Sequence, residues 1–164
     1  MVYIISTILR KAFENHSSMS TQTSPESIWK SLMLLPNDYG YEALYNEVTR
    51  KLMTKIEFEH GGTEYDSQYP KGIPTKMTIT TKNGHEYDSG LILFPGGHSA
   101  NKTVDLKEIL KFKFESLGAL GMDESECKNF VENLENIAKL DNKQLKSIYD
   151  CDIEFKDKSI DAAQ

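Results

Sequence analysis

The residues best suited to chemistry lie in a glycine-containing turn, PGGHSANKT, at positions 95–103. His98 stands there between an apolar run and the start of an expected helix. A histidine that acts as a general base needs an orienting carboxylate or a nucleophile within hydrogen-bond distance. No such motif accompanies His98, so we interpret it as a loop residue that caps the turn or contacts a neighbouring domain. A substrate-facing role is the alternative.

The same turn precedes a helix and could therefore bind a phosphate. A phosphate-binding loop of the form G-x-x-x-x-G-K-[ST] needs a second glycine directly before its lysine, and none precedes Lys102-Thr103. The strand before the turn also belongs to an expected antiparallel hairpin rather than to a parallel βαβ unit. General anion binding at the helix N-terminus stays open. We expect no cofactor.

The remaining histidines and the cysteines are scattered. His16, His60 and His85 have no histidine four residues away, so we expect no metal site. Cys127 and Cys151 are too few for a disulfide framework or a four-cysteine zinc site. They are expected to be reduced thiols of an intracellular protein, either cytoplasmic or mitochondrial.

Carboxylates and tyrosines add no further catalytic set. The acidic residues fall where helix caps and solvated faces would place them. Tyr65, Tyr69 and Tyr87 could line a pocket, but aromatic residues beside a small sheet more often pack. We therefore predict no catalytic side chains in this chain.

Composition limits the partners. The 164 residues, 38% hydrophobic and 27% charged, suit one globular domain with a core. Nineteen Lys and Arg against twenty-five Asp and Glu give a net charge of −6, which argues against nucleic acid as a partner. No apolar run is long enough to cross a bilayer, so no membrane partner is expected. Arg10 and Lys11 follow the first apolar stretch, unlike the order in a secretory signal.

The spacing of apolar residues changes along the chain and predicts the elements that position these residues. We expect helices within 1–53, a sheet within 54–95, helices within 104–150, and a flexible tail at 156–164. In the first helix, one apolar stripe is expected to face the core; it comprises Val2, Ile5, Leu9 and Phe13, widened by Ile4 and Ile8. Ser24 is expected to cap a helix that begins at Pro25.

The expected sheet has about three short antiparallel strands. Alternation at residues 54–60 predicts the first strand, and runs on either side of Asn83-Gly84 predict a hairpin. The order of helices, sheet and helices is typical of an α+β fold with segregated elements. Residues 1–155 are treated as one domain.

Apolar stripes define the other helices. The helix near residue 48 is expected to bury Leu44, Val48 and Leu52, and Asp105 with Glu108 predicts a capping box at the next long helix. That helix is expected to bury a stripe of Leu106, Ile109, Leu110, Phe114 and Leu117. The following one is expected to bury Phe130, Leu134 and Ile137.

The order of these motifs resembles the C-terminal region of the MmgE/PrpD family, which includes 2-methylcitrate dehydratase and cis-aconitate decarboxylase. The matching features are a P-x-x-[VM]-x-[IV]-x-x-x-x-G hairpin, a Phe-Pro-x-Gly turn, a helix with Lys-Phe, and an L-E-x-[IL]-x-x-L stretch. They lie at Pro74–Gly84, Phe94–His98, Lys113-Phe114 and Leu134–Leu140. The resemblance extends upstream through residues 50–74 and the first helix, and so covers nearly the whole chain.

The resemblance implies a small lid-like domain that packs on a much larger helical catalytic domain. The acid–base and substrate-carboxylate residues of the family lie mostly in that other domain, so none can be assigned here. Apolar faces at Met1 and on the last helices should then lack a partner. His98, Asn101 and Lys102 are the residues expected to contact the missing domain or its tricarboxylate substrate.

Three functions follow from the sequence. The first is the C-terminal part of an MmgE/PrpD-type lyase, inactive without its helical domain. The second is a non-catalytic interaction module that pairs with itself, as a homo-oligomer, or with a full-length family member. The third, a small enzyme acting alone, is the weakest because no acid–base pair is visible.

Overall fold

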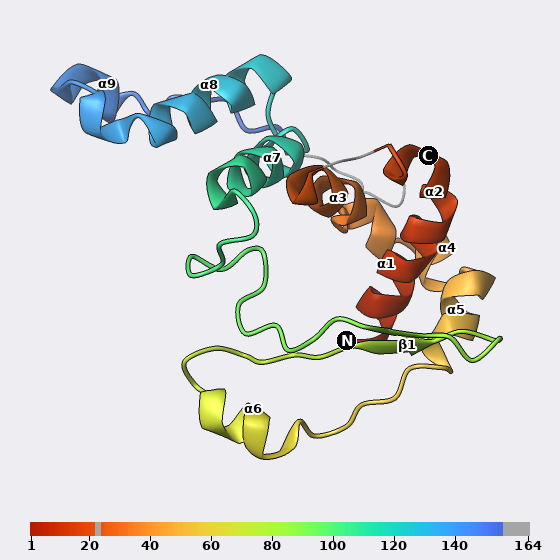
Figure 1. Cartoon of the computed structure of the whole chain (residues 1–164). Helices are drawn as coiled ribbons and strands as arrows, with labels where there is room; N and C mark the ends of the chain where they lie inside the picture. The colour runs from red at the N-terminus through yellow and green to blue at the C-terminus, as the bar shows by residue number, and fades with distance from the viewer. Residues whose placement is uncertain (22–23, 156–164) are drawn as a thin grey trace.

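The computed structural model describes residues 1–21 and 24–155. In these ranges the chain is mostly helical and has one small antiparallel sheet of two strands. Six α-helices precede the sheet and three follow it in the described ranges, with α8 and α9 extending away from the N-terminal helices (Figure 1). The tail expected at 156–164 lies outside the described residues.

Short helices make up the N-terminal part of the fold. They are α1 (Val2–Glu14), α2 (His16–Met19), α3 (Pro25–Leu32), the 3₁₀ helix η1 (Pro36–Tyr39), α4 (Tyr41–Leu44) and α5 (Glu47–Met53). The Ser24 hydroxyl accepts a hydrogen bond from the backbone N–H of Ser27, which confirms the predicted cap. The helix expected around Val48 is broken in two, because the Asn46 side chain accepts from the N–H groups of Val48 and Thr49 and starts a new helix.

The contact between α1 and α5 is built from small polar residues. Ser6 and Thr7 of α1 and Thr49 of α5 are fully buried, and Arg10 Nε donates to Thr49 Oγ1 over 2.9 Å. The predicted apolar stripe of α1 is only partly buried: Val2, Ile5 and Leu9 are half-buried, and Phe13, its last member, is 69% exposed. Small side chains at this contact allow the two helix backbones to approach closely.

The other predicted stripe in this region is wrong. Leu44 and Val48 are exposed, and the buried residue of α5 is Thr49. Further along, residues 62–68, expected as part of a loop, form α6 (Gly62–Gln68). The strand expected at 54–60 is not formed: residues 56–60 are neither helix nor strand.

The hairpin is confirmed, with a different turn. β1 (Thr78–Thr80) pairs antiparallel with β2 (Glu86–Asp88), with Ile79 opposite Tyr87. We expected positive φ at both Asn83 and Gly84, but Gly84 alone has it, at φ +80. Gly84 N–H donates to Thr81 O and Thr81 N–H donates to His85 O, which defines a three-residue loop that ends in a left-handed glycine.

The C-terminal helices contain the apolar core. α7 (Leu106–Gly118) packs on α8 (Glu124–Glu135), followed by η2 (Ile137–Lys139) and α9 (Asn142–Lys146). The buried apolar residues are Ile109, Cys127, Val131 and Ile148. An added Cβ at Gly118 would lie 2.4 Å from Cys127 Sγ, so this glycine sets how closely the two helices pack.

The predicted stripes of α7 and α8 are only partly buried. Ile109 is 1% exposed, as expected, but Phe114 is 55% exposed and Ile137 is 49% exposed. Leu110 and Leu134 are exposed as well. The two helices cover each other along one line of contact, and α3 on α7 and the segment after α9 on α8 cover only part of the remaining apolar surface.

Two carboxylates join α3 to α7. The Asp105 side chain caps α7 by accepting from Lys107 and Glu108, as predicted. The expected reciprocal partner, Glu108, instead binds Lys30 of α3 with a Nζ–Oε1 distance of 2.5 Å. Its place in the capping box is taken by Glu26, whose Oε1 accepts from the Asp105 N–H over 2.7 Å.

Candidate functional site

The turn between the hairpin and α7 is organised by Asn101. Its Nδ2 donates to the carbonyl oxygen of Phe94 over 2.7 Å. Its Oδ1 accepts from the backbone N–H groups of Thr103 and Val104 and from the Thr103 hydroxyl. One half-buried amide therefore ties the start of the turn to its end, which is a structural role.

His98 and Lys102 lie on the outside of the same turn, and both side chains are exposed. The His98 ring stacks on Phe94 with a centroid separation of 4.8 Å, and its Nδ1 accepts from the Ala100 N–H over 3.0 Å. Among the described residues, no carboxylate or nucleophile contacts either side chain, so the turn contains no acid–base pair.

The N-terminus of α7 already holds two carboxylates. Asp105 accepts from the N–H groups of Lys107 and Glu108, and Glu26 accepts from the N–H of Asp105. The Asp105 N–H also lowers the pKa of the Glu26 carboxyl below its ordinary value. These donors would otherwise bind an external anion, so the arrangement weighs against a phosphate site at this helix.

A histidine–carboxylate pair lies instead at the start of α6. His60 Nε2 is 3.5 Å from Asp66 Oδ1, and His60 Nδ1 accepts from the Gly62 N–H over 3.1 Å. The ring also contacts the edge of Tyr65. Both members of the pair are more than half exposed, and all of His60's contacts lie within its own loop and α6. The pair therefore closes the first turn of α6.

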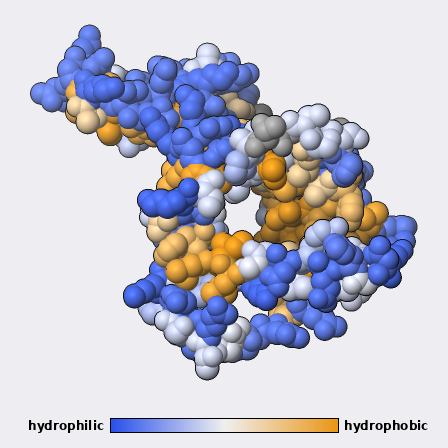
Figure 2. All heavy atoms as spheres, viewed as in Figure 1, coloured by the Kyte–Doolittle hydropathy of each residue, from blue (hydrophilic) through white to orange (hydrophobic). Residues whose placement is uncertain are grey.

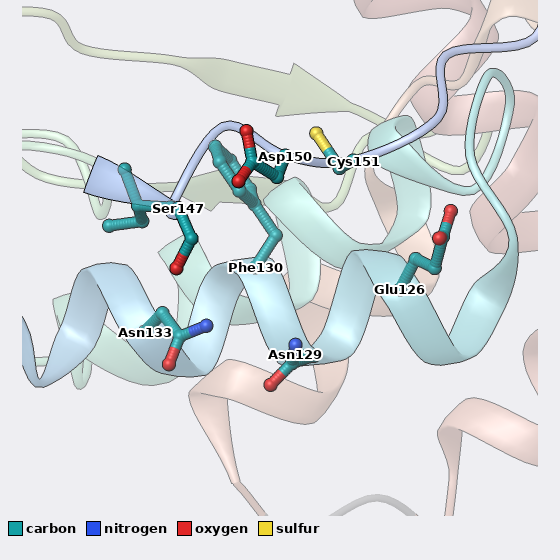
Figure 3. Close-up of a pocket in the computed structure, with 8 residues that line it drawn as sticks. Glu126, Asn129, Phe130, Asn133, Ser147, Asp150 and Cys151 are labelled. Carbon is teal, nitrogen blue, oxygen red and sulfur yellow. The ribbon is translucent and has the colours of Figure 1, made fainter. Parts of the chain in front are cut away.

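A small pocket lies between α8 and the segment that follows α9. In Figure 3 the Phe130 ring of α8 points toward Asp150, and Asn129 and Asn133 of α8 with Ser147 and Cys151 of the following segment also line the pocket. The pocket encloses about 70 Å³ and is completed by Glu126 and Ile148. Its lining carries two carboxylates and no lysine or arginine, so it cannot hold a tricarboxylate by charge pairing.

The cysteines differ in environment. Cys127 is 2% exposed and lies beneath the last turn of α7, whereas Cys151 is half-buried beside the small pocket. Both are free thiols. Burial, together with the charge of Glu115, raises the pKa of the Cys127 thiol. Because the thiolate is the reactive form, Cys127 is a packing residue rather than a nucleophile.

The described residues contain neither a metal-binding cluster nor a membrane-spanning helix. No three His, Cys, Asp or Glu side chains there gather in a way that could hold a metal ion. None of the helices in residues 1–21 and 24–155 combines the length and the apolar character needed to cross a membrane.

The most prominent functional feature is uncovered apolar surface. Figure 2 shows apolar residues on the walls of an opening enclosed by the N-terminal helices, the hairpin and α7. Exposed apolar side chains also continue along the C-terminal part of the chain. They include Leu134, Ile137, Tyr149 and Ile153, of which Tyr149 is 74% exposed.

Known proteins offer no further guide to this surface. No protein-family model, no curated protein and no solved structure matches this chain.

Proposed function

We propose that this chain is a non-catalytic interaction module that is completed by association with another chain. The observation that carries the proposal is the size of its accessible surface, 12421 Å². A compact monomer of 18.6 kDa should expose about 8,200 Å². The chain therefore exposes roughly half as much surface again as a folded monomer of its mass.

The excess is large enough for a permanent interface. It amounts to about 4,200 Å² for one chain, while obligate interfaces bury about 2,000–5,000 Å² over both partners, or about 1,000–2,500 Å² on each. Part of this surface is apolar, with Met1 78% exposed and Phe13 69% exposed at the two ends of α1. Such side chains are normally covered in a protein that acts alone.

The polar groups of the described residues support a binding role rather than catalysis. Their histidines contact their own loops, and the small pocket is acidic. The strongest internal polar contacts hold elements together: Lys11 Nζ is 2.8 Å from Asp38 Oδ2, and both side chains are largely buried. These contacts stabilise the scaffold and leave no acid–base set free for a substrate.

The test is the association state of the purified chain. Light scattering coupled to size exclusion, from low to high micromolar protein, should show reversible association. Added salt should strengthen it, because each copy carries a charge of −6 and screening reduces their repulsion. A dye that fluoresces on exposed apolar surface should bind the dilute chain and be released on association. A monomer that binds no such dye at any concentration would refute the proposal.

A second candidate is the lid portion of an MmgE/PrpD-type lyase that acts on 2-methylcitrate or cis-aconitate. It is supported by the order of the hairpin, the Phe-Pro-Gly turn and the Lys-Phe helix, and by the uncovered apolar faces that the resemblance leads one to expect. In this proposal the partner is a helical catalytic domain, the sheet has about three strands, and His98 and Lys102 face the partner or its substrate.

The two candidates differ in their partner. Mixing the chain with a full-length family member should produce a complex if the second candidate is correct, and the chain alone should not turn over either tricarboxylate. Failure to bind that protein, together with self-association of the chain, would leave the first candidate alone. Turnover by the isolated chain would contradict both.

A further inference from the structure

The two-stranded sheet has a free edge on β1. Ser89 N–H donates to Met77 O and Thr81 N–H donates to His85 O, so these residues use their backbone groups within the hairpin. Bonded and non-bonded residues alternate along an antiparallel pair. Thr78 and Thr80 therefore direct their N–H and C=O groups away from β2, where the described chain supplies no partner strand.

A strand-like segment elsewhere in the chain is also unpaired. Residues 55–60 alternate Ile56 and Phe58 with Lys55, Glu57 and Glu59. In the structure, residues 56–60 make no backbone hydrogen bond to the described chain, and Phe58 is 61% exposed. This segment forms the thin tube between α5 and α6 in Figure 1. It has the pattern of a half-buried strand without the sheet.

The segment and the β1 edge are complementary. One face of the hairpin carries Met77, Ile79 and Tyr87, which are all exposed, and Ile56 and Phe58 of an added strand would extend that face. Glu57 and Glu59 would then lie on the opposite face. On that face the β1 side carries Lys76 and Lys82, and β2 carries Glu86 and Asp88. Lys76 is already paired with Asp88 over 2.8 Å, so Lys82 is the lysine left for an added strand, where opposite charges on neighbouring strands are favourable.

Both ends of the segment are anchored in the chain's own fold. At one end α5 packs on α1. Beyond the other end, after α6, Gly72 is buried so closely against Leu93 that an added Cβ would lie 2.6 Å from Leu93 Cδ1. Each chain thus has both an unpaired sheet edge and an unpaired strand-like segment. In a pair of copies, the segment of each can bind the β1 edge of the other, and this arrangement forms a two-fold symmetric dimer.

We infer that residues 55–60 of one copy add as a third strand to the β1 edge of a second copy. The inference rests on the proposed association and names its partner and its contact. Each exchange would pair the backbone groups of Thr78 and Thr80 and would cover Phe58 and Ile79. This is strand addition at a sheet edge, in which main-chain bonds supply affinity and alternating side chains supply specificity.

Proline substitutions test the edge directly. Thr78→Pro removes an outward N–H that the hairpin does not use, and so should block strand addition while β1 still pairs with β2. Glu86→Pro makes the same change on the outer edge of β2 and is the matched control. We expect Thr78→Pro and Phe58→Glu each to weaken self-association by about tenfold or more, and Glu86→Pro to leave it unchanged. Far-UV circular dichroism and thermal melts establish that each variant is folded.

Amide hydrogen exchange of the unaltered chain gives an independent measurement. Residues 56–60, Thr78 and Thr80 should become protected as the protein concentration rises into the range where the chain associates. Association without protection of these amides, or equal association of Thr78→Pro, would overturn the inference and leave the proposed function standing. If these amides are equally protected at all protein concentrations, residues 56–60 pair with β1 of their own chain, and the inference is also overturned. A chain that never associates and binds no apolar dye would overturn both.

Discussion

Asn101 is the residue on which the turn before α7 depends most. Its amide makes four hydrogen bonds that span Phe94 to Val104. Replacing it with alanine leaves half-buried backbone groups without partners, so Asn101→Ala should lower the free energy of unfolding by about 1–3 kcal/mol. Urea denaturation measures this change.

Lys102→Ala is the control for that variant, because Lys102 is exposed and touches nothing that would be lost. It should change stability by less than about 0.5 kcal/mol. Equal stability of the two variants would show that the Asn101 bonds contribute nothing net. A loss of partner binding in Lys102→Ala at unchanged stability would point to the contact role that the sequence suggested.

The two thiols should react at different rates. Cys127 is 2% exposed and its pKa is raised by burial, whereas Cys151 is half-buried at the chain surface. In the native chain at mildly alkaline pH, a thiol reagent should modify Cys151 promptly. The rate of modification of Cys127 should be lower by about tenfold or more. The check is the time course of thiol release in the native and the urea-unfolded chain.

Cys151→Ser should remove the prompt phase alone. A native Cys127 that reacts as quickly as it does in urea would mean that α7 and α8 open readily and do not protect it.

At the scale of elements, the packing of α7 on α8 depends on Gly118. A methyl group there meets Cys127 Sγ at 2.4 Å, so Gly118→Ala should destabilise the chain by about 1–3 kcal/mol despite the better helix propensity of alanine. Gly97→Ala is the matched control, since an added Cβ there meets no atom within 4 Å. Chemical denaturation compares the two.

A second substitution sharpens this test. Cys127→Ala removes the sulfur that clashes, so the double variant should lose less stability than the sum of the two single changes. Strict additivity would show that the clash with Cys127 is not the cause.

The contact between α3 and α7 should depend on pH through Glu26. Because the N–H of Asp105 lowers the pKa of the folded Glu26 carboxyl, this carboxylate stabilises the fold above the ordinary carboxyl pKa of about 4.3. The contribution is lost as the pH falls through the lowered pKa. Glu26→Gln should therefore melt at a lower temperature than the unaltered chain at pH 7, and the gap should narrow towards about pH 3.

Melting curves between these two pH values measure the gap. Glu42→Gln is the control, since the exposed Glu42 makes no comparable bond, and its gap should stay small and constant. If the difference in melting temperature between Glu26→Gln and the unaltered chain is the same at acid pH, ionisation of Glu26 does not contribute to the stability of this contact.

At the scale of the whole molecule, the described chain is open. The buried apolar residues Ile109, Cys127, Val131 and Ile148 all belong to the C-terminal part, while the buried residues of α1 and α5 are Ser6, Thr7 and Thr49. The N-terminal helices thus bury small polar side chains fully, whereas the apolar side chains of α1 are at most half-buried. Because so few apolar side chains are fully buried, binding of a partner should add substantially to the stability of the chain.

Small-angle X-ray scattering of the dilute chain should reflect this openness. A compact protein of 164 residues has a radius of gyration of about 15 Å. The isolated chain should exceed that value when the data are extrapolated to zero concentration. A measured radius at the compact value would mean that the chain closes on itself and that its apolar faces are covered internally.

The sequence by itself determined the local features that depend on neighbouring residues. The Ser24 cap, the Asp105 cap and the hairpin around Gly84 follow from groups that bond within a few positions along the chain, and the structure contains all three. Asn46 could have been included, because a side chain that caps a helix start also signals a break in the middle of an apolar pattern. The His98 turn was likewise recognised as a corner between elements, although the bonding of Asn101 was not.

Only the tertiary structure decided which faces are covered. The periodicity of α1 and α7 marks Phe13 and Phe114 as core residues just as strongly as Ile109, yet Ile109 alone is buried. Periodicity identifies which face of a helix is apolar, but it does not identify the element that packs against that face. Here small polar residues are the ones fully buried in α1 and α5. In the same way, residues 55–60 carry the alternation of a strand, but a strand forms only where it pairs with a neighbouring edge, and residues 56–60 make no backbone hydrogen bond to the described chain.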